Sequence, residues 1–147
     1  MMRNHLKLFL PMLVLALAAL ACGGSAPVTL ESLPKFDGAV ALEDGQSTVA
    51  EAVVEALQQT AGQEGVTAET LVYGVPAETT WDAIQTYYAN NLGSDWTEDN
   101  ELKQESEGFN TVGWTRGGLA SEQAVIVAYV DDPLAGQSFL IVVLFSE

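Results

Sequence analysis

Hydrophobic residues follow a helical period between residues 48 and 61. Thr48 and Glu51 stand three positions apart, which is the spacing of a helix-capping box. Behind them four apolar residues share one helical face, and Gly62 follows where a helix can stop. The segment therefore predicts an amphipathic helix whose buried face carries Ala50, Val53, Val54 and Leu57.

A second helical period opens at Thr79 and closes at Gly93. Asp82 follows Thr79 by three positions, and glycine is a favoured residue just beyond a helix C-terminus. The apolar residues between them again fall on one face. This segment predicts a second helix, with Trp81, Ile84, Tyr88 and Leu92 directed toward a core.

The other apolar segments have the two-residue period or the short continuous runs of β-strands. Residues 124–130 and 139–145 are nearly continuous apolar runs, which predicts two central, largely buried strands. Residues 131–136 join them as a hairpin loop. Weaker strand patterns lie at residues 36–42, 70–75 and 111–116, and the acidic stretch 95–108 has room for a short exposed strand.

The elements follow one another as strand, helix, strand, helix and then several strands. This order predicts an α+β fold, because strands that follow one another without a crossover helix pair antiparallel. We expect an antiparallel β-sheet with two helices packed on one face. A length of 147 residues fits one domain.

The N-terminus has the parts of a secretory signal peptide. Arg3 and Lys7 form a short basic region, residues 8–21 carry no charge, and Cys22 is followed by small residues. A membrane-spanning helix needs about 20 apolar residues. The uncharged run is shorter, and Pro11 interrupts it, so a retained transmembrane helix is the weaker interpretation.

The segment Ala19-Leu20-Ala21-Cys22 resembles the lipobox of bacterial lipoproteins, with Ala19 where that family usually has leucine. The resemblance implies that the Cys22 thiol receives a diacylglyceryl group and that a peptidase removes residues 1–21. Two acyl chains, such as palmitate, hold a protein at a membrane far better than one. The alternative is an ordinary secretory signal in which Cys22 is incidental.

The lipobox interpretation divides the chain into three parts. Residues 1–21 are the signal peptide, and residues 22–34 are a lipid-anchored linker, because Gly, Ser, Ala and Pro dominate them. Residues 35–147 form the α+β domain. We expect the protein at the cell membrane, on its extracytoplasmic face.

The charge of the chain excludes several classes of function. Twenty acids and five bases give a formal charge of −15, which opposes nucleic-acid binding. Cleavage after residue 21 would lower it to −17, and anionic lipid would repel such a domain. It would also remove His5, the single histidine, and leave Cys22 acylated. Ser-His-Asp and Cys-His catalysis and imidazole zinc sites are then excluded, and no catalytic residue, metal or cofactor is predicted.

Two groups of acidic residues have alternative interpretations. The carboxylates between Asp95 and Glu107 are numerous enough for calcium, but their spacing is not that of an EF-hand, and we interpret the stretch as a solvated acidic loop. Asp131 and Asp132 could serve a carboxylate-based hydrolase. Their place in the predicted hairpin favours turn chemistry instead.

The aromatic residues divide between the core and a candidate binding surface. Trp81 and Tyr88 lie on the predicted buried helix face. Tyr87 lies off that face and Trp96 lies beside the acidic loop, so both are candidates for a ligand or partner surface. Arg116 would either hold a ligand carboxylate or pair with a neighbouring acid.

The mature part also loosely resembles uncharacterised bacterial envelope lipoproteins, through Tyr87-Tyr88, Leu92-Gly93 and Trp96. This resemblance implies a location and a fold but no activity. The functional hypothesis is a membrane-anchored lipoprotein whose small domain binds an envelope protein or a small ligand without catalysis. A structural or assembly subunit of an envelope complex and a carboxylate-based hydrolase are the alternatives.

Overall fold

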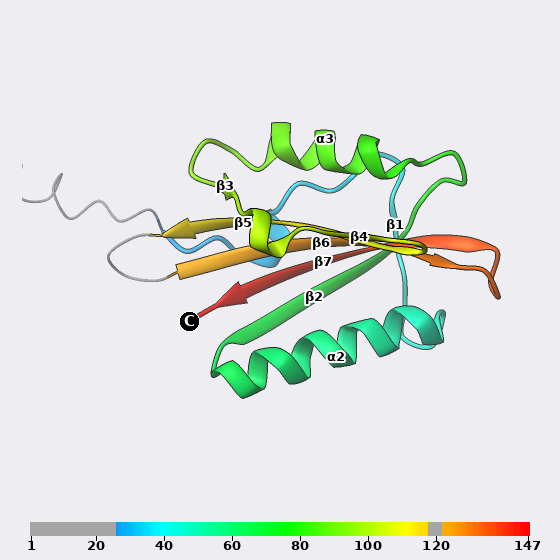
Figure 1. The fold of residues 1–147 in the computed structure, drawn as a ribbon, viewed down its shortest axis with the longest axis horizontal. Helices are drawn as coiled ribbons and strands as arrows, with labels where there is room; N and C mark the ends of the chain where they lie inside the picture. Colours follow the sequence, from blue (N-terminus) through cyan, green and yellow to red (C-terminus); the bar gives the residue numbers. More distant parts are fainter. Residues whose placement is uncertain (1–25, 118–121) are drawn as a thin grey trace, which may run out of the picture.

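The computed structural model describes residues 26–117 and 122–147, so the predicted signal peptide and Cys22 lie outside the described residues. This part forms one antiparallel sheet in the order β1-β2-β7-β6-β5-β3, with β4 also paired to β5 (Figure 1). The strands are β1 (Val40–Ala41), β2 (Thr67–Gly74), β3 (Thr97–Glu98), β4 (Gln104–Ser106), β5 (Phe109–Gly117), β6 (Glu122–Asp132) and β7 (Gln137–Ser146).

The helical elements are two α-helices and two short 3₁₀ turns within the described ranges. They are η1 (Leu30–Ser32), α2 (Thr48–Glu64), α3 (Trp81–Asn91) and η2 (Asn100–Leu102). The α+β class and the antiparallel sheet are therefore as predicted. The central position of the last two strands is confirmed, because β7 and β6 lie in the middle of the strand order. No helix in the described ranges is long and apolar enough to cross a membrane.

The prediction that both helices pack on one face of the sheet is wrong. Figure 1 shows α3 on one side of the sheet and α2 on the other. The central strands explain this arrangement, since successive side chains of a strand point to opposite faces. In β7, Leu140, Val142 and Leu144 pack in one apolar cluster with Ile84 and Tyr88 of α3, which we call the α3 core. Phe139, Ile141 and Val143 pack in a second cluster with Ala50 of α2, which we call the α2 core. Two apolar faces need two covering layers.

Helix α2 begins and ends slightly away from the predicted positions. Ser47, rather than Thr48, is the N-cap, and its hydroxyl accepts a hydrogen bond from the Ala50 amide at 3.1 Å. The helix continues through Gly62 and ends at Gly65. Gly65 has φ +76°, a conformation that glycine adopts without the steric cost of a Cβ, so it terminates the helix.

Helix α3 has the predicted buried face. Ile84 and Tyr88 are fully buried, and Trp81 and Leu92 are partly buried against the same core. Thr80 caps the helix, with its hydroxyl accepting from the Ala83 amide at 3.3 Å. The helix thereby carries the rings that pack on β5 and β6.

The packed part of the chain begins before residue 35, where we predicted the domain to start. Leu30 is 7% exposed and belongs to the α3 core. The backbone amide and carbonyl of Val28 both bond the Gln123 side chain of β6, each at 2.9 Å. The predicted linker therefore includes residues that contribute to the core. An isolated leucine in a polar segment can still pack against apolar residues elsewhere in the chain.

Candidate functional site: an apolar groove beside α2

The two faces of the sheet are covered to different extents. On one face, α3 lies over β5 and β6, where the rings of Tyr88 and Trp114 are 6.3 Å apart and Trp81 stacks on Tyr129. The segment around Leu30 covers β2 on the same side. On the opposite face α2 covers β2 and β7. There the described chain places no second α-helix over β5 and β6, and only the short η2 turn packs on β5.

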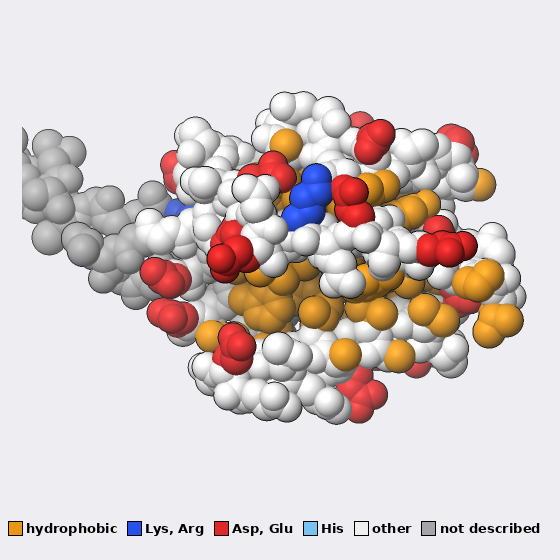
Figure 2. All heavy atoms as spheres, viewed as in Figure 1, with side chains coloured by type: hydrophobic (Ala, Val, Ile, Leu, Met, Phe, Trp, Pro, Cys, Tyr) orange, Lys and Arg blue, Asp and Glu red, His pale blue; other side chains and the backbone are white. Residues whose placement is uncertain are grey.

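An apolar groove of about 570 Å³ lies on this half-covered face, between α2 and η2. Figure 2 shows hydrophobic side chains gathered in a band above α2. Ala124 and Phe145 are direct cross-strand partners and Ile126 follows on the same face of β6, so the three form a continuous floor. Leu57 and Ala61 of α2 form one wall.

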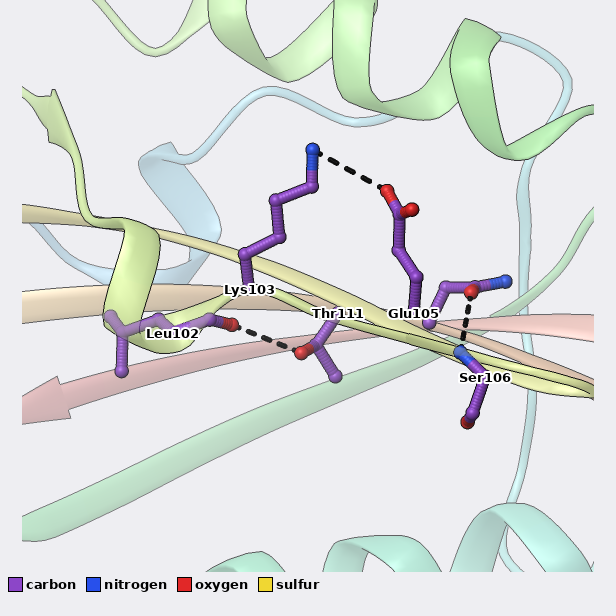
Figure 3. A network of polar contacts seen from close by, with 6 residues as sticks. Leu102, Lys103, Glu105, Ser106 and Thr111 are labelled. Atoms are coloured by element: carbon purple, nitrogen blue, oxygen red, sulfur yellow. Dashed lines mark hydrogen bonds and ion pairs between the residues drawn. The ribbon is translucent and has the colours of Figure 1, made fainter.

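The opposite wall of the groove is Leu102, which η2 carries. The Thr111 hydroxyl donates to the Leu102 carbonyl at 3.0 Å (Figure 3), and the Asp99 amide donates to the Gly113 carbonyl at 2.9 Å. A Cβ on Gly113 would lie 2.6 Å from Leu102 Cβ and Cδ1, closer than van der Waals contact permits. Glycine at position 113 therefore lets the Leu102 side chain lie directly on β5.

Carboxylates form the rim of the groove. Glu64 ends α2, Glu122 begins β6 and Glu147 follows β7, and all three line the groove. Arg116 is the single base among the described residues that line it. Its guanidinium carbon lies 5.6 Å from the centre of the Trp96 ring, in the core on the other side of the sheet. The potential at the groove mouth is therefore negative.

The predicted surface residue Tyr87 has a structural role on α3. Its hydroxyl donates to the Lys35 carbonyl, and its ring meets the Phe36 ring edge-on at 5.2 Å. These contacts hold the segment before β1 against the helix. Tyr87 lies on the α3 side of the sheet and does not line the groove.

The structure brings Trp96 and Arg116 together, but not as an exposed surface. Trp96 is only 9% exposed, contrary to the surface position we predicted, because the turn after α3 folds it onto the core beneath Arg116. The Arg116 side chain is 11% exposed, and its Nη2 lies 3.9 Å from Asp95 Oδ2. Pairing with a neighbouring acid, one of the two alternatives for Arg116, is thus observed. A guanidinium over an indole face also gains cation–π attraction.

Tyrosines in the α3 core are the titratable groups with perturbed pKa values. Burial raises the pKa of Tyr88 strongly, and Tyr73 and Tyr87 add to the effect. The nearby Phe36 backbone lowers the pKa of Tyr88 and so offsets part of this effect. The Tyr88 hydroxyl itself has no hydrogen-bond partner. Burial also raises the pKa of Tyr73 and of Tyr87, in the second case helped by Asp37. Desolvation disfavours the phenolate, so these hydroxyls stay protonated.

The acidic stretch 95–108 contains β3, η2 and β4, so the short exposed strand allowed for it is present. Asp99 Oδ1 accepts from the Glu101 amide at 2.9 Å and caps η2. Glu105 Oε1 lies 3.4 Å from Lys103 Nζ (Figure 3). Within residues 26–117 and 122–147, no three side chains of His, Cys, Asp or Glu converge as a metal site would require.

The acids in the β6–β7 hairpin have the turn chemistry that their position indicated. Asp132 is 5% exposed, and its Oδ1 accepts the amides of Leu134 and Ala135, both at 3.0 Å. Asp131 Oδ1 accepts from the Ser138 hydroxyl at 2.6 Å. Both carboxylates therefore stabilise the hairpin between the two central strands.

Sequence reasoning missed the residues that form the groove. Ile126 and Phe145 belong to strands that we predicted correctly. Both strands are apolar on both faces, so the residue pattern does not show which part of a face remains only partly covered. One sequence feature pointed to the wall of the groove, because Leu102 is the only aliphatic residue between Trp96 and Phe109. An isolated leucine in an acidic stretch indicates a local apolar contact.

No family model matches this chain, and no curated protein or solved structure matches it either. The functional argument therefore depends on the geometry and charge of this molecule.

Proposed function

We propose that this chain is a lipid-anchored extracytoplasmic lipoprotein whose α+β domain binds a partner through the apolar groove, without catalysis. The observation that carries the binding role is the apolar floor of Ala124, Ile126 and Phe145, which is only partly buried between α2 and η2. Apolar surface with a polar rim is typical of interaction sites.

The anchor part of the proposal depends on the lipobox-like segment before Cys22. A diacylglyceryl thioether would hold the protein to the membrane, while the charge of −17 that remains after cleavage would keep the domain away from anionic headgroups. A tethered domain of this kind presents its groove to partners outside the cytoplasm. Asp131 and Asp132, the acids considered above for a hydrolase, are engaged in hydrogen bonds of the hairpin, which favours binding over catalysis.

Metabolic labelling with an alkyne palmitate analogue tests the anchor. We expect the wild-type chain to incorporate the label and to fractionate with membranes. The Cys22→Ala variant should lose the label, because the thioether cannot form without the thiol. A wild-type protein that remains unlabelled and begins at Met1 would contradict the anchor.

Photo-crosslinking in intact cells tests binding at the groove. Thr60 lines the groove, whereas Gln59 beside it on α2 is exposed and does not. A photoreactive residue at position 60 should give a discrete adduct that the same residue at position 59 does not give. Identical adduct patterns at both positions, or none at position 60, would contradict a partner at this site.

A further inference from the structure

We infer that the groove accepts one face of a basic amphipathic helix from a partner protein. The inference rests on the proposed binding function and specifies the chemistry of the partner. Two observations carry it, namely the partly buried apolar floor between α2 and η2 and the acidic rim of the groove.

The α2 side of the sheet is less completely covered than the α3 side. On the α3 side, a helix covers β5 and β6 and the segment around Leu30 covers β2. On the α2 side, α2 covers β2 and β7 and the short η2 turn packs on β5, so the partly buried floor lies between α2 and η2. A helix is about 10 Å wide with its side chains, and strands are about 4.8 Å apart, so one helix covers roughly two strands. A helix that lies between α2 and η2 would cover this floor.

The groove itself fits side chains rather than an entire helix. Its volume of about 570 Å³ lies between the Leu57 wall and the Leu102 wall. A helix presents apolar residues at positions i, i+3, i+4 and i+7 on one face, and such anchors enter a hydrophobic groove of this kind. The helix body would then lie above the floor, parallel to the strands that form it.

The rim selects the charge of the partner. Glu64, Glu122 and Glu147 surround the apolar floor, and the guanidinium of Arg116 is engaged with Trp96 and Asp95. Lysine or arginine residues that flank the apolar face of a helix would meet these carboxylates. A second copy of this chain, with its charge of −15, and an anionic lipid would both be repelled.

The test uses a fluorescein-labelled 17-residue peptide with leucines on one helical face and lysines flanking them. Its binding to protein purified from cells that express the full chain is measured by fluorescence anisotropy at low salt. We expect saturable binding that weakens as NaCl rises, because exposed charge pairs are screened. The same peptide with glutamates for lysines, or with alanines for leucines, should not bind.

Rim variants locate the binding surface. Glu64→Gln with Glu122→Gln should raise Kd by about fivefold, since each exposed ion pair contributes modestly. The matched control is Glu78→Gln with Glu107→Gln, which removes the same two charges at exposed positions outside the groove and should leave Kd unchanged. Absence of binding, equal binding of the glutamate peptide, or equal effects of the two pairs would overturn the inference.

The outcomes separate this inference from the proposed function. A lysine peptide that fails to bind, together with a labelled Cys22 and a crosslink at position 60, would remove the basic helix alone. Peptide binding to a protein that carries no lipid would instead remove the anchor and leave the groove as a site for basic helices.

Discussion

Individual residues in the α3 core show how burial and hydrogen bonding act separately. Tyr87 and Tyr88 are neighbours whose rings lie 5.3 Å apart and nearly perpendicular. The Tyr87 hydroxyl donates to the Lys35 carbonyl, whereas the Tyr88 hydroxyl is buried without a partner. An unpartnered buried hydroxyl costs about 1–3 kcal/mol. Two identical side chains therefore contribute differently to the free energy of unfolding.

Replacing Tyr88 by Phe should leave the protein equally stable or more stable by up to about 1 kcal/mol at pH 7, because it removes a polar group with no partner. The variant should also be less sensitive to alkali. The pKa of Tyr88 is raised in the folded protein, whereas the unfolded chain ionises near 10. The contribution of the protonated Tyr88 side chain to stability is therefore fully present below about pH 10, and it is lost as the pH rises above that value.

Urea unfolding at pH 7 and pH 11 measures both effects. The control is Tyr87→Phe, which should lose about 0.5–1.5 kcal/mol at pH 7 because the Lys35 carbonyl loses its donor. A Tyr88→Phe protein that lost more than about 1 kcal/mol at pH 7 would show that the hydroxyl is satisfied after all.

At the scale of elements, α2 has one glycine in its last turns and another at its C-cap, and the two have opposite roles. Gly62 lies inside the helix, and a Cβ there would meet no atom within 4 Å. Gly65 has φ +76° and terminates the helix. Gly62→Ala should therefore stabilise the protein by about 0.5–1 kcal/mol, and Gly65→Ala should destabilise it by about 1 kcal/mol.

Thermal unfolding followed by circular dichroism distinguishes these two variants, and each serves as the control for the other. The helix is otherwise unchanged, since Ser47 still caps its N-terminus in both. Shifts of Tm in the same direction for both variants would mean that α2 does not end at Gly65. Helix length matters for the groove, because Ala61 and Glu64 in the last turn line it.

At the scale of the whole molecule, the excess of acids opposes folding. The chain has twenty acids and five bases, and the excess negative charges repel one another more strongly in the compact state than in the unfolded chain. Raising NaCl from 0.05 to 0.3 M should increase Tm by about 3 °C, because salt screens this repulsion. The variant with Glu78→Lys and Glu107→Lys should have a higher Tm at low salt and gain less from added NaCl. An equal gain in both proteins would contradict the electrostatic origin.

The sequence by itself determined the elements and their class. Periodicity located both helices, the two central strands and the hairpin between them, because burial of one helix face or of both strand faces leaves a direct pattern in the residue types. The turn role of Asp131 and Asp132 was also predictable, since aspartate bonds nearby backbone amides within a few residues.

Only the tertiary structure decided how the layers cover the sheet. The apolar runs of β6 and β7 require cover on both faces but do not say which helix provides it, so the two helices were wrongly placed together. The burial of Trp96 beneath Arg116 and the apolar groove between α2 and η2 depend on contacts between residues far apart in the chain. Local periodicity indicates that a side chain is buried. The residue that it contacts across the core depends on how the complete molecule packs.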